Sequence, residues 1–348
     1  MNDAGPVENP GNGMTSGFPL TLAQRRIWSL EQIGNATVFP LQVLSLVWNE
    51  TVTRDQVQSA LVKLAQRHAA LRTRFRRFPG GRIEQFAIAD EIPSIEILGS
   101  ASNPLDASQA EQQRDAFASR PFDLLHDASC RCQIIVVARG RILSTIVVHP
   151  IACDTAALSL LHGELVALVK GDTLAPNDDD GLQRGIREEE LLAGDAFAAA
   201  LSHWRDHIGQ EYTSSALPTR FNGAGYAGAG RRHVSFQLDA PLWAGMRAFA
   251  DHHDTTPDLL LSAAFAILLA RYSGTYAVQY GVLLSNRETA ENRLTVCRSE
   301  QILPVKIGLA SRARVLDVCR SISAAVQAGT DHPLPFERLV AEIQNHED

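Results

Sequence analysis

The sequence predicts an α/β protein built of two lobes. The chain has 348 residues, of which 45% are hydrophobic and 20% charged, a composition typical of a folded protein too long for one small core. Strand-like and helical segments are mixed along it, and a stretch rich in Asp and Glu separates two groups of them. We therefore expect a disordered lead-in at 1–17, an N-terminal lobe at 18–170, an acidic linker at 171–193 and a second lobe at 194–348.

The N-terminal lobe is expected to begin with a helix that Thr21 caps, followed by a strand over the apolar run 41–48. Thr53 and Asp55 then begin a second helix. Alternating residues around a Pro-Gly-Gly turn predict a hairpin at 72–88.

A second hairpin is expected at 133–148, around Arg139-Gly140, and it runs directly into His149-Pro150. Asp154 or Thr155 then caps a helix with a regular leucine stripe.

The second lobe is expected to mix helices and strands. The helix at 257–272 is strongly apolar, which predicts that it is buried. The other expected helices lie at 194–209, 240–252, 315–328 and 335–344, and the expected strands at 233–238, 276–284 and 302–307.

Charge and cysteine content exclude several classes of protein. The formal net charge of -7 argues against a nucleic-acid-binding surface, and no apolar run approaches the roughly 20 residues that cross a bilayer. The start of the chain lacks the features of a signal peptide. Five cysteines, an odd number, indicate reduced thiols, so we expect a cytoplasmic protein. Cys130 and Cys132 share one face of a strand without a second Cys/His pair nearby, and we expect no bound metal or cofactor.

Several short blocks occur in a fixed order. They are FPLTLAQRRIW at 18–28, RHAALRTRF at 67–75, PFDL at 121–124, Trp204-Arg205 preceded by His203, the stretch from Leu269 through Gly281 to Arg287, and PFERLV at 335–340. Together they resemble the condensation domains of nonribosomal peptide synthetases over residues 18–345. The resemblance implies two chloramphenicol-acetyltransferase-like lobes in a V-shaped arrangement. A tunnel between them would admit the phosphopantetheine arms of carrier proteins.

In that family the tunnel holds the motif His-His-x-x-x-Asp-Gly, whose second His is implicated in amide formation. The matching residues here are His149 to Thr155, with Pro150 in place of the second His and Thr155 in place of the Gly. Proline has no basic side-chain nitrogen and no N–H, so we expect no catalytic residue in this motif remnant. The resemblance implies that Asp154 and Arg287 pair as a structural contact, which is compatible with helix capping by Asp154.

His149 is the alternative base. In a regular strand its ring points away from position 150, and a bulge near Pro150 would be needed to re-aim it. A buried, hydrogen-bonded structural histidine is favoured.

Other candidates have simpler interpretations. Cys153 lies in an apolar setting, which raises a thiol pKa and makes it inert. His252-His253 suits the end of a helix, where cationic side chains interact well with the dipole. Glu288 and Glu291 are expected to be solvated loop charges.

Arg74 and Arg76 share one face of the first hairpin, opposite Phe75. This face is interpreted as a charged strand edge that discourages strand addition. The alternative is a contact with an anion or a carrier protein.

The family continues beyond the Pro-Phe-Glu helix with further strands and a final helix, whereas this sequence ends at Asp348. We therefore expect an incomplete second lobe. The preceding block is also altered, with Cys297 in place of a Gly and Gln301 in place of an Asn.

The resemblance implies two alternative functions. One is an interface platform that docks carrier protein beside neighbouring synthetase domains and recruits a trans-acting tailoring oxygenase of the haem or non-haem iron type. The other is an amide-forming acyltransferase on carrier-bound thioesters, in which positioning of the reactants replaces the missing base. The platform is favoured because both departures fall on the groups that acid–base chemistry would need. A purely structural remnant between neighbouring domains is a third hypothesis.

Overall fold

The computed structural model describes residues 17–33, 39–177, 181–208, 217, 236–287, 293–310 and 312–344. The chain divides into two compact units. Unit 1 comprises Met1–Gly194 together with Ser285–Gln301, and unit 2 comprises Asp195–Leu284 together with Ile302–Asp348. The sequence had placed 285–301 in the second lobe. The structure differs because this segment supplies hydrogen bonds to a buried carboxylate of unit 1, as described below.

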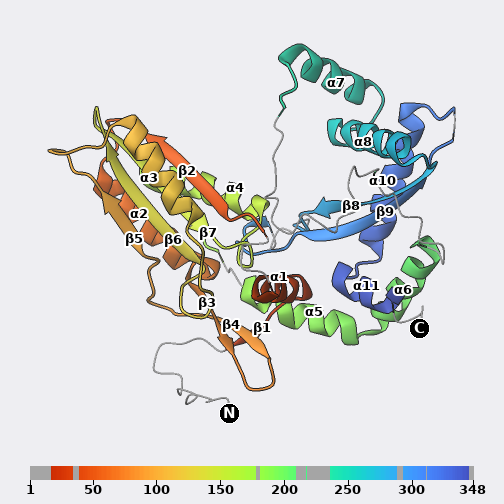
Figure 1. Ribbon diagram of the computed structural model, residues 1–348, viewed down its shortest axis with the longest axis horizontal. Coiled ribbons are helices and arrows are strands. Elements are labelled where there is room, and N and C mark those ends of the chain that lie inside the picture. The colour runs from red at the N-terminus through yellow and green to blue at the C-terminus, as the bar shows by residue number, and fades with distance from the viewer. Residues whose placement is uncertain are drawn as a thin grey trace, which may run out of the picture. The chain divides into compact units, whose positions relative to one another are not determined.

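Unit 1 is built on a four-stranded sheet in the order β2-β7-β6-β5 (Figure 1). The strands are β2 (Gln42–Trp48), β5 (Ile95–Leu98), β6 (Cys130–Val137) and β7 (Arg141–Val148). β5 is parallel to β6, and the other neighbours are antiparallel. The β6–β7 hairpin that the sequence predicted turns through the three residues 138–140, of which Arg139 and Gly140 have φ values of 64° and 68°.

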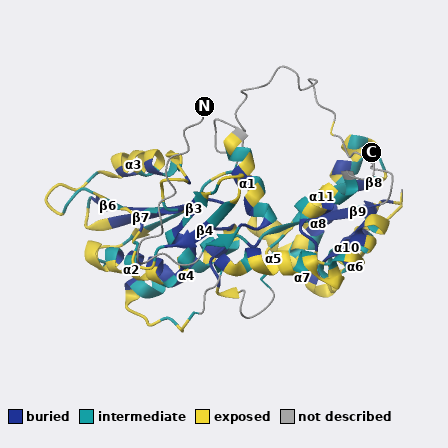
Figure 2. Cartoon of the chain, turned by 90° about the horizontal axis from the view of Figure 1, so that it is seen from below, coloured by how far each residue is buried: buried dark blue, intermediate teal, exposed yellow. Residues whose placement is uncertain are grey.

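Helices cover both faces of this sheet. α2 (Arg54–Arg67) and α4 (Thr155–Lys170) enclose a core that contains Ile134 and Val136 of β6, whereas α3 (Ala107–Ser119) packs over Ile135 and Val137. β6 and β7 are consequently buried over nearly their whole length (Figure 2). Burial on both faces explains why their sequences are nearly continuous apolar runs.

A smaller sheet in the order β1-β4-β3 completes unit 1. Its strands are β1 (Phe18–Pro19), β3 (Thr73–Arg77) and β4 (Ile83–Ala87), and η1 (Ala69–Arg72) leads into β3. The β3–β4 hairpin turns through Gly80 and Gly81, both at a φ of 86°, which favours glycine.

Residues that were expected to be a solvated linker form part of unit 1. η2 (Gly181–Gln183) and α5 (Arg184–Ala193) pack against β1 and the start of α1 (Leu22–Ile33). A Cβ on Gly185 would lie 2.0 Å from the Pro19 carbonyl oxygen, so only glycine allows this approach. Glu188 accepts a hydrogen bond from the Leu22 N–H, and Glu189 pairs with Arg25 at 2.9 Å. Through these contacts the acidic helix α5 packs as part of unit 1.

Unit 2 joins helices to a two-stranded sheet of β8 (Ala277–Leu284) and β9 (Gln301–Gly308). Its helices are α6 (Asp195–Ile208), α7 (Ala240–His252), α8 (Pro257–Ser273), α10 (Val315–Asp331) and α11 (Phe336–Gln344). The core includes Ala263 of α8, Val278 of β8, Val305 of β9 and Ile322 of α10. Of the strand expected at 233–238, residues 233–235 lie outside the described part and 236–238 are not in a strand. None of the described helices is long and apolar enough to cross a membrane.

Helix α8 differs from the buried helix that its sequence predicted. One side, which includes Leu260, Ala263 and Ala266, is buried in the core of unit 2. The other side carries Leu261, Phe265, Leu268 and Tyr272, which are 41–61% exposed. The sequence is apolar on both sides, but the described elements of unit 2 cover only one of them.

Candidate functional site

The motif remnant occupies the turn between β7 and α4. The apolar run of β7 ends at Val148, and α4 begins at Thr155. Pro150 donates no backbone hydrogen bond, and its carbonyl accepts one from Arg298 Nη1 at 3.2 Å. The next carbonyl, of Ile151, accepts from Gln24 Nε2 of α1 at 3.0 Å. Side chains from two distant segments therefore hold this turn.

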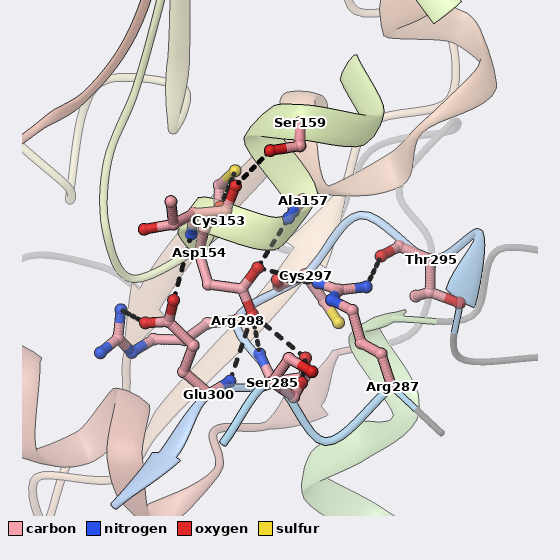
Figure 3. Close-up of polar contacts among 12 residues, drawn as sticks. Cys153, Asp154, Ala157, Ser159, Ser285, Arg287, Thr295, Cys297, Arg298 and Glu300 are labelled. Carbon is pink, nitrogen blue, oxygen red and sulfur yellow. Dashed lines mark hydrogen bonds and ion pairs between the residues drawn. The ribbon is translucent and has the colours of Figure 1, made fainter. Parts of the chain in front are cut away.

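Asp154 is the most completely bonded side chain of the site, and it is fully buried (Figure 3). Its Oδ1 accepts from the Ala157 N–H at 2.8 Å, which caps α4, and from Arg287 Nη2 at 2.9 Å. Its Oδ2 accepts from the N–H groups of Ser299 at 2.8 Å and Glu300 at 3.2 Å. Burial of a carboxylate is costly unless it is paired and hydrogen-bonded, and both oxygens meet that condition here.

Arg287 joins Asp154 to the 285–301 segment. Its guanidinium donates to the carbonyl of Thr295 and, at 3.0 Å, to that of Cys297 (Figure 3). The Ser299 hydroxyl lies 3.1 Å from Asp154 Oδ2 and 2.7 Å from the Ser285 carbonyl, and it donates its one proton to either acceptor. The structure thus brings Asp154 and Arg287 together within unit 1, in a network that fixes the path of residues 285–300.

His149 is buried, with 2% of its surface exposed, and both ring nitrogens are engaged. Nδ1 accepts a hydrogen bond from the Ile151 N–H at 3.2 Å, and Nε2 lies 2.8 Å from Glu31 Oε1 of α1. Because Nδ1 is an acceptor, the proton of the neutral ring is on Nε2 and is donated to Glu31. Phe122 packs against the ring edge-to-face, with centroids 5.6 Å apart. No lone pair of this imidazole is left to accept a proton from a substrate.

Thr155 takes the position of the family's glycine and is exposed at the start of α4. Its backbone N–H donates to Glu300 Oε1 at 3.3 Å. The Glu300 carboxylate also faces Arg298, at 3.9 Å. A branched side chain at Thr155 and the Glu300 carboxylate therefore lie side by side at the start of α4.

Cys153 is fully buried, and its thiol donates to the Asp154 carbonyl at 3.3 Å. Burial, reinforced by the neighbouring Asp154 charge, raises the thiol pKa well above its ordinary value. A hydrogen bond with Cys132, together with burial, raises the pKa of Cys130 in the same direction. A thiol that stays protonated is a poor nucleophile and metal ligand, which disfavours a reactive centre at either residue.

Three further groups of residues were singled out from the sequence. His252 and His253 occupy the end of α7 in unit 2, and His253 is its C-cap. Glu288 and Glu291 lie outside the described residues. Arg74 forms an ion pair with Glu91 and donates to the His126 carbonyl; the hydrogen bond to Glu91 raises the Arg74 pKa.

Sequence reasoning missed most of the partners that define the site. Glu31, Arg298, Ser299 and Glu300 were not singled out, although each contacts the motif remnant. They lie between 118 and 148 residues away from their partners in the chain. No local sequence pattern reveals contacts at that separation. The one signal that could have drawn attention to Glu31, Arg298 and Glu300 is their charge beside apolar runs.

The comparison with protein families matches the condensation domain model over residues 14–348. Tyrocidine synthase 2 of Brevibacillus parabrevis is 26% identical over 331 residues, covering 94% of this chain and 9% of the synthase. Phosphinothricin tripeptide synthetase PhsC of Streptomyces viridochromogenes is 28% identical over 346 residues, covering 94% of this chain and 31% of the synthetase. The chain thus spans less than a third of the length of these relatives.

Solved structures show the same fold. The condensation domain of the Monacolin K polyketide synthase MokA matches with a TM-score of 0.81 at 17% identity, over 95% of this chain and 77% of that one. The X-domain from teicoplanin biosynthesis, solved in a complex with OxyB, matches with a TM-score of 0.77 at 24% identity, over 97% and 74%. The mixed α/β architecture is therefore the chloramphenicol-acetyltransferase-like fold expected from the sequence, and the chain belongs to the condensation-domain family.

Proposed function

We propose that this chain is a catalytically degenerate condensation-like domain that acts as an interface platform in nonribosomal peptide biosynthesis. It docks a peptidyl or acyl carrier protein with its phosphopantetheine arm, beside neighbouring synthetase domains. It recruits a trans-acting tailoring oxygenase to the carrier-bound substrate. We place this role in the cytoplasm, in the synthesis of a secondary metabolite.

The observation that carries this proposal is the absence of an available base in the motif remnant. Pro150 has no basic atom. The neighbouring His149 is buried, with Nδ1 accepting from the Ile151 N–H and Nε2 donating to Glu31. To act as a general base, His149 would have to break its bond to Ile151 and turn out of its contact with Phe122. Both changes would expose or unpair buried polar groups, which costs about 1–3 kcal/mol for each group.

The retained part of the motif supports the same reading. Asp154 and Arg287 are engaged with backbone groups of α4 and of residues 295–300, so these contacts do not depend on a catalytic side chain at position 150. The X-domain that was solved with OxyB offers a precedent in this fold for a domain that binds a partner protein.

The alternative function, an amide-forming acyltransferase with an altered mechanism, requires that positioning alone supplies the rate. It predicts that amide product forms from two loaded carrier proteins. It further predicts that His149→Ala or Asp154→Asn abolishes this product.

The test combines binding and chemistry on one protein preparation. The purified chain is titrated with loaded carrier protein and with candidate oxygenases of the same pathway, and intact mass spectrometry follows amide product. We expect saturable binding without product, and no product from the Pro150→His variant. Product from the unchanged chain that disappears in the His149→Ala variant would establish the acyltransferase instead. The absence of all binding would leave only the structural role.

A further inference from the structure

The β3–β4 hairpin of unit 1 ends in an arginine cluster that the proposed function does not yet use. Arg76, Arg77 and Arg82 lie around its turn, and we refer to these three residues as the arginine tip. Between Phe75 and Gln85 the only acidic residue is Glu84, so this short segment carries a net charge of +2 in a chain whose formal net charge is -7. The hairpin loop extends away from the sheet of unit 1 (Figure 1).

Two guanidinium groups of the tip are held by aromatic rings. The Arg76 guanidinium carbon lies 4.6 Å from the Phe78 ring centroid and 5.6 Å from that of Phe86. The Arg82 guanidinium carbon lies 4.8 Å from the same Phe78 centroid. These are cation–π distances, so both charges are positioned before any partner arrives and lose less side-chain entropy when one binds.

One carboxylate is shared between those two arginines. Glu84 lies 3.4 Å from Arg76 and 3.0 Å from Arg82, and the Arg82 side chain remains 69% exposed. Arg77 is exposed and has no ion-pair partner among the residues that the structure describes. The tip therefore presents more positive charge than its own carboxylate neutralises. Arg74, further along β3, is different because Glu91 pairs with it.

We infer that the arginine tip is an electrostatic docking surface for a carboxylate-bearing face of the carrier protein. This inference rests on the proposed function, and it assigns the carrier to one named surface of unit 1. A protein partner is favoured over a nucleic acid because the arginine tip is confined to one hairpin turn, whereas nucleic-acid binding draws on a longer series of phosphate contacts.

The size of the tip fits a partner that must arrive and leave. Three arginines make a contact smaller than a stable interface, and partly exposed charges contribute mainly to the rate of encounter. A carrier that delivers a substrate needs fast association and release more than a long residence time. The association rate should consequently fall as salt shortens the range of the charges.

The test is a titration of the purified chain with its cognate loaded carrier protein at low and physiological salt. Arg77→Glu and Arg82→Glu are compared with Arg141→Glu, a matched control at the start of β7, beside the turn of the other hairpin of unit 1. We expect the two tip variants to bind about fivefold to tenfold more weakly, mainly through slower association, and the control to bind unchanged. A carrier with a compensating Glu→Lys change on the face that binds the tip should recover affinity for Arg82→Glu. Thermal unfolding of each variant checks that the hairpin remains folded.

The outcomes separate the surface from the function. Carrier binding that is equally strong in the tip variants, or equally weakened in Arg141→Glu, would overturn the docking surface and leave the platform intact. Failure of the unchanged chain to bind any loaded carrier would overturn both. Binding of a single-stranded oligonucleotide with the same dependence on Arg77 and Arg82 would reassign the tip to nucleic acid.

Discussion

The two units bury polar groups in different ways. In unit 1 the buried charges are paired: Asp154 with Arg287, and Glu164 with His68 at 2.5 Å and with Arg67 at 3.0 Å. In unit 2 the buried Nε2 atoms of His203 and His207 have no hydrogen-bond partner among the described residues, as is also true of Arg131 Nε and Gln133 Oε1 in unit 1. The difference between the units is therefore one of charge: unit 1 holds its buried carboxylates in ion pairs, whereas the environment of the two unit 2 histidines favours their uncharged form.

The largest effect is expected at Asp154. Asp154→Ala would leave the Arg287 guanidinium buried without its carboxylate, and we expect unit 1 to lose about 3–5 kcal/mol of unfolding free energy in a denaturant titration. The matched control is Asp106→Ala, since Asp106 caps α3 through the Gln109 N–H but is exposed; its loss should cost about 1 kcal/mol. Equal losses of unfolding free energy in the two variants would mean that Asp154 acts only as a helix cap.

A smaller loss is expected at His149. His149→Ala removes the bond to Glu31 and the packing against Phe122, so we expect a decrease of about 2–3 kcal/mol in the free energy of unfolding. Glu31→Gln keeps a hydrogen-bond acceptor and should cost less. Carrier binding measured on both variants should be unchanged, because neither residue lies on the arginine tip. A loss of carrier binding in His149→Ala with an unchanged melting temperature would contradict a purely structural role.

Unit 2 is expected to lose stability as the pH falls through the ordinary range of histidine. The rings of His203 and His332 stack with centroids 4.0 Å apart. Burial is the main cause that lowers the His203 pKa, and the charges of His332 and His207 lower it further, whereas the Asp206 charge acts in the opposite direction. Burial and the Lys306 charge lower the His207 pKa. The unfolded chain, with the ordinary value of 6.5, then binds more protons than the folded one, so stability is lost as the pH falls through and below about 6.5.

The measurement is thermal unfolding at pH 7.5 and pH 5.5. We expect the unit 2 transition to fall by roughly 2–4 °C, and the shift to diminish in His203→Tyr, which introduces the residue of the family block. An equally large fall in the unfolding temperature of His203→Tyr would mean that other groups cause the pH dependence.

The smallest effect is expected from Pro150→His. The residue lies in a turn, its carbonyl bond to Arg298 does not involve the side chain, and the change in stability should stay below about 1.5 kcal/mol. We also expect no amide product by intact mass, since Thr155 still stands in place of the glycine and Glu300 beside it. Restored product would mean that position 150 alone separates a platform from an enzyme.

The sequence predicted the parts of the fold that local patterns decide. The turn at Arg139 and Gly140, the cap at Asp154 and most helices of unit 2 depend on neighbouring residues, and the structure has them. It missed β5, α3 and α5. Their contacts are made with segments distant in the chain. In α5, for example, a run of charged residues joins the fold through the contacts of Glu188 and Glu189 with α1.

The site was predictable only in part, for the same physical reason. Its motif residues are contiguous, but the Glu31 and Ser299 contacts close loops of 118 and 145 residues. The exposed side of α8 shows the converse, because an apolar sequence indicates what a helix can bury and not what is there to cover it.

Because unit 1 is built from two chain segments, the ribosome completes its parts at different times. Asp154 leaves the ribosome 133 residues before Arg287, a delay of roughly 7–27 s at ordinary elongation rates. During that interval the carboxylate can cap α4 but lacks its guanidinium and the N–H groups of Ser299 and Glu300. The sheet and helices of unit 1 can form first, and the Asp154 carboxylate is neutralised only when residues 285–301 have been synthesised. A ribosome-bound intermediate that ends before residue 285 should therefore resemble the finished unit in secondary structure but be more sensitive to protease around the β7–α4 turn.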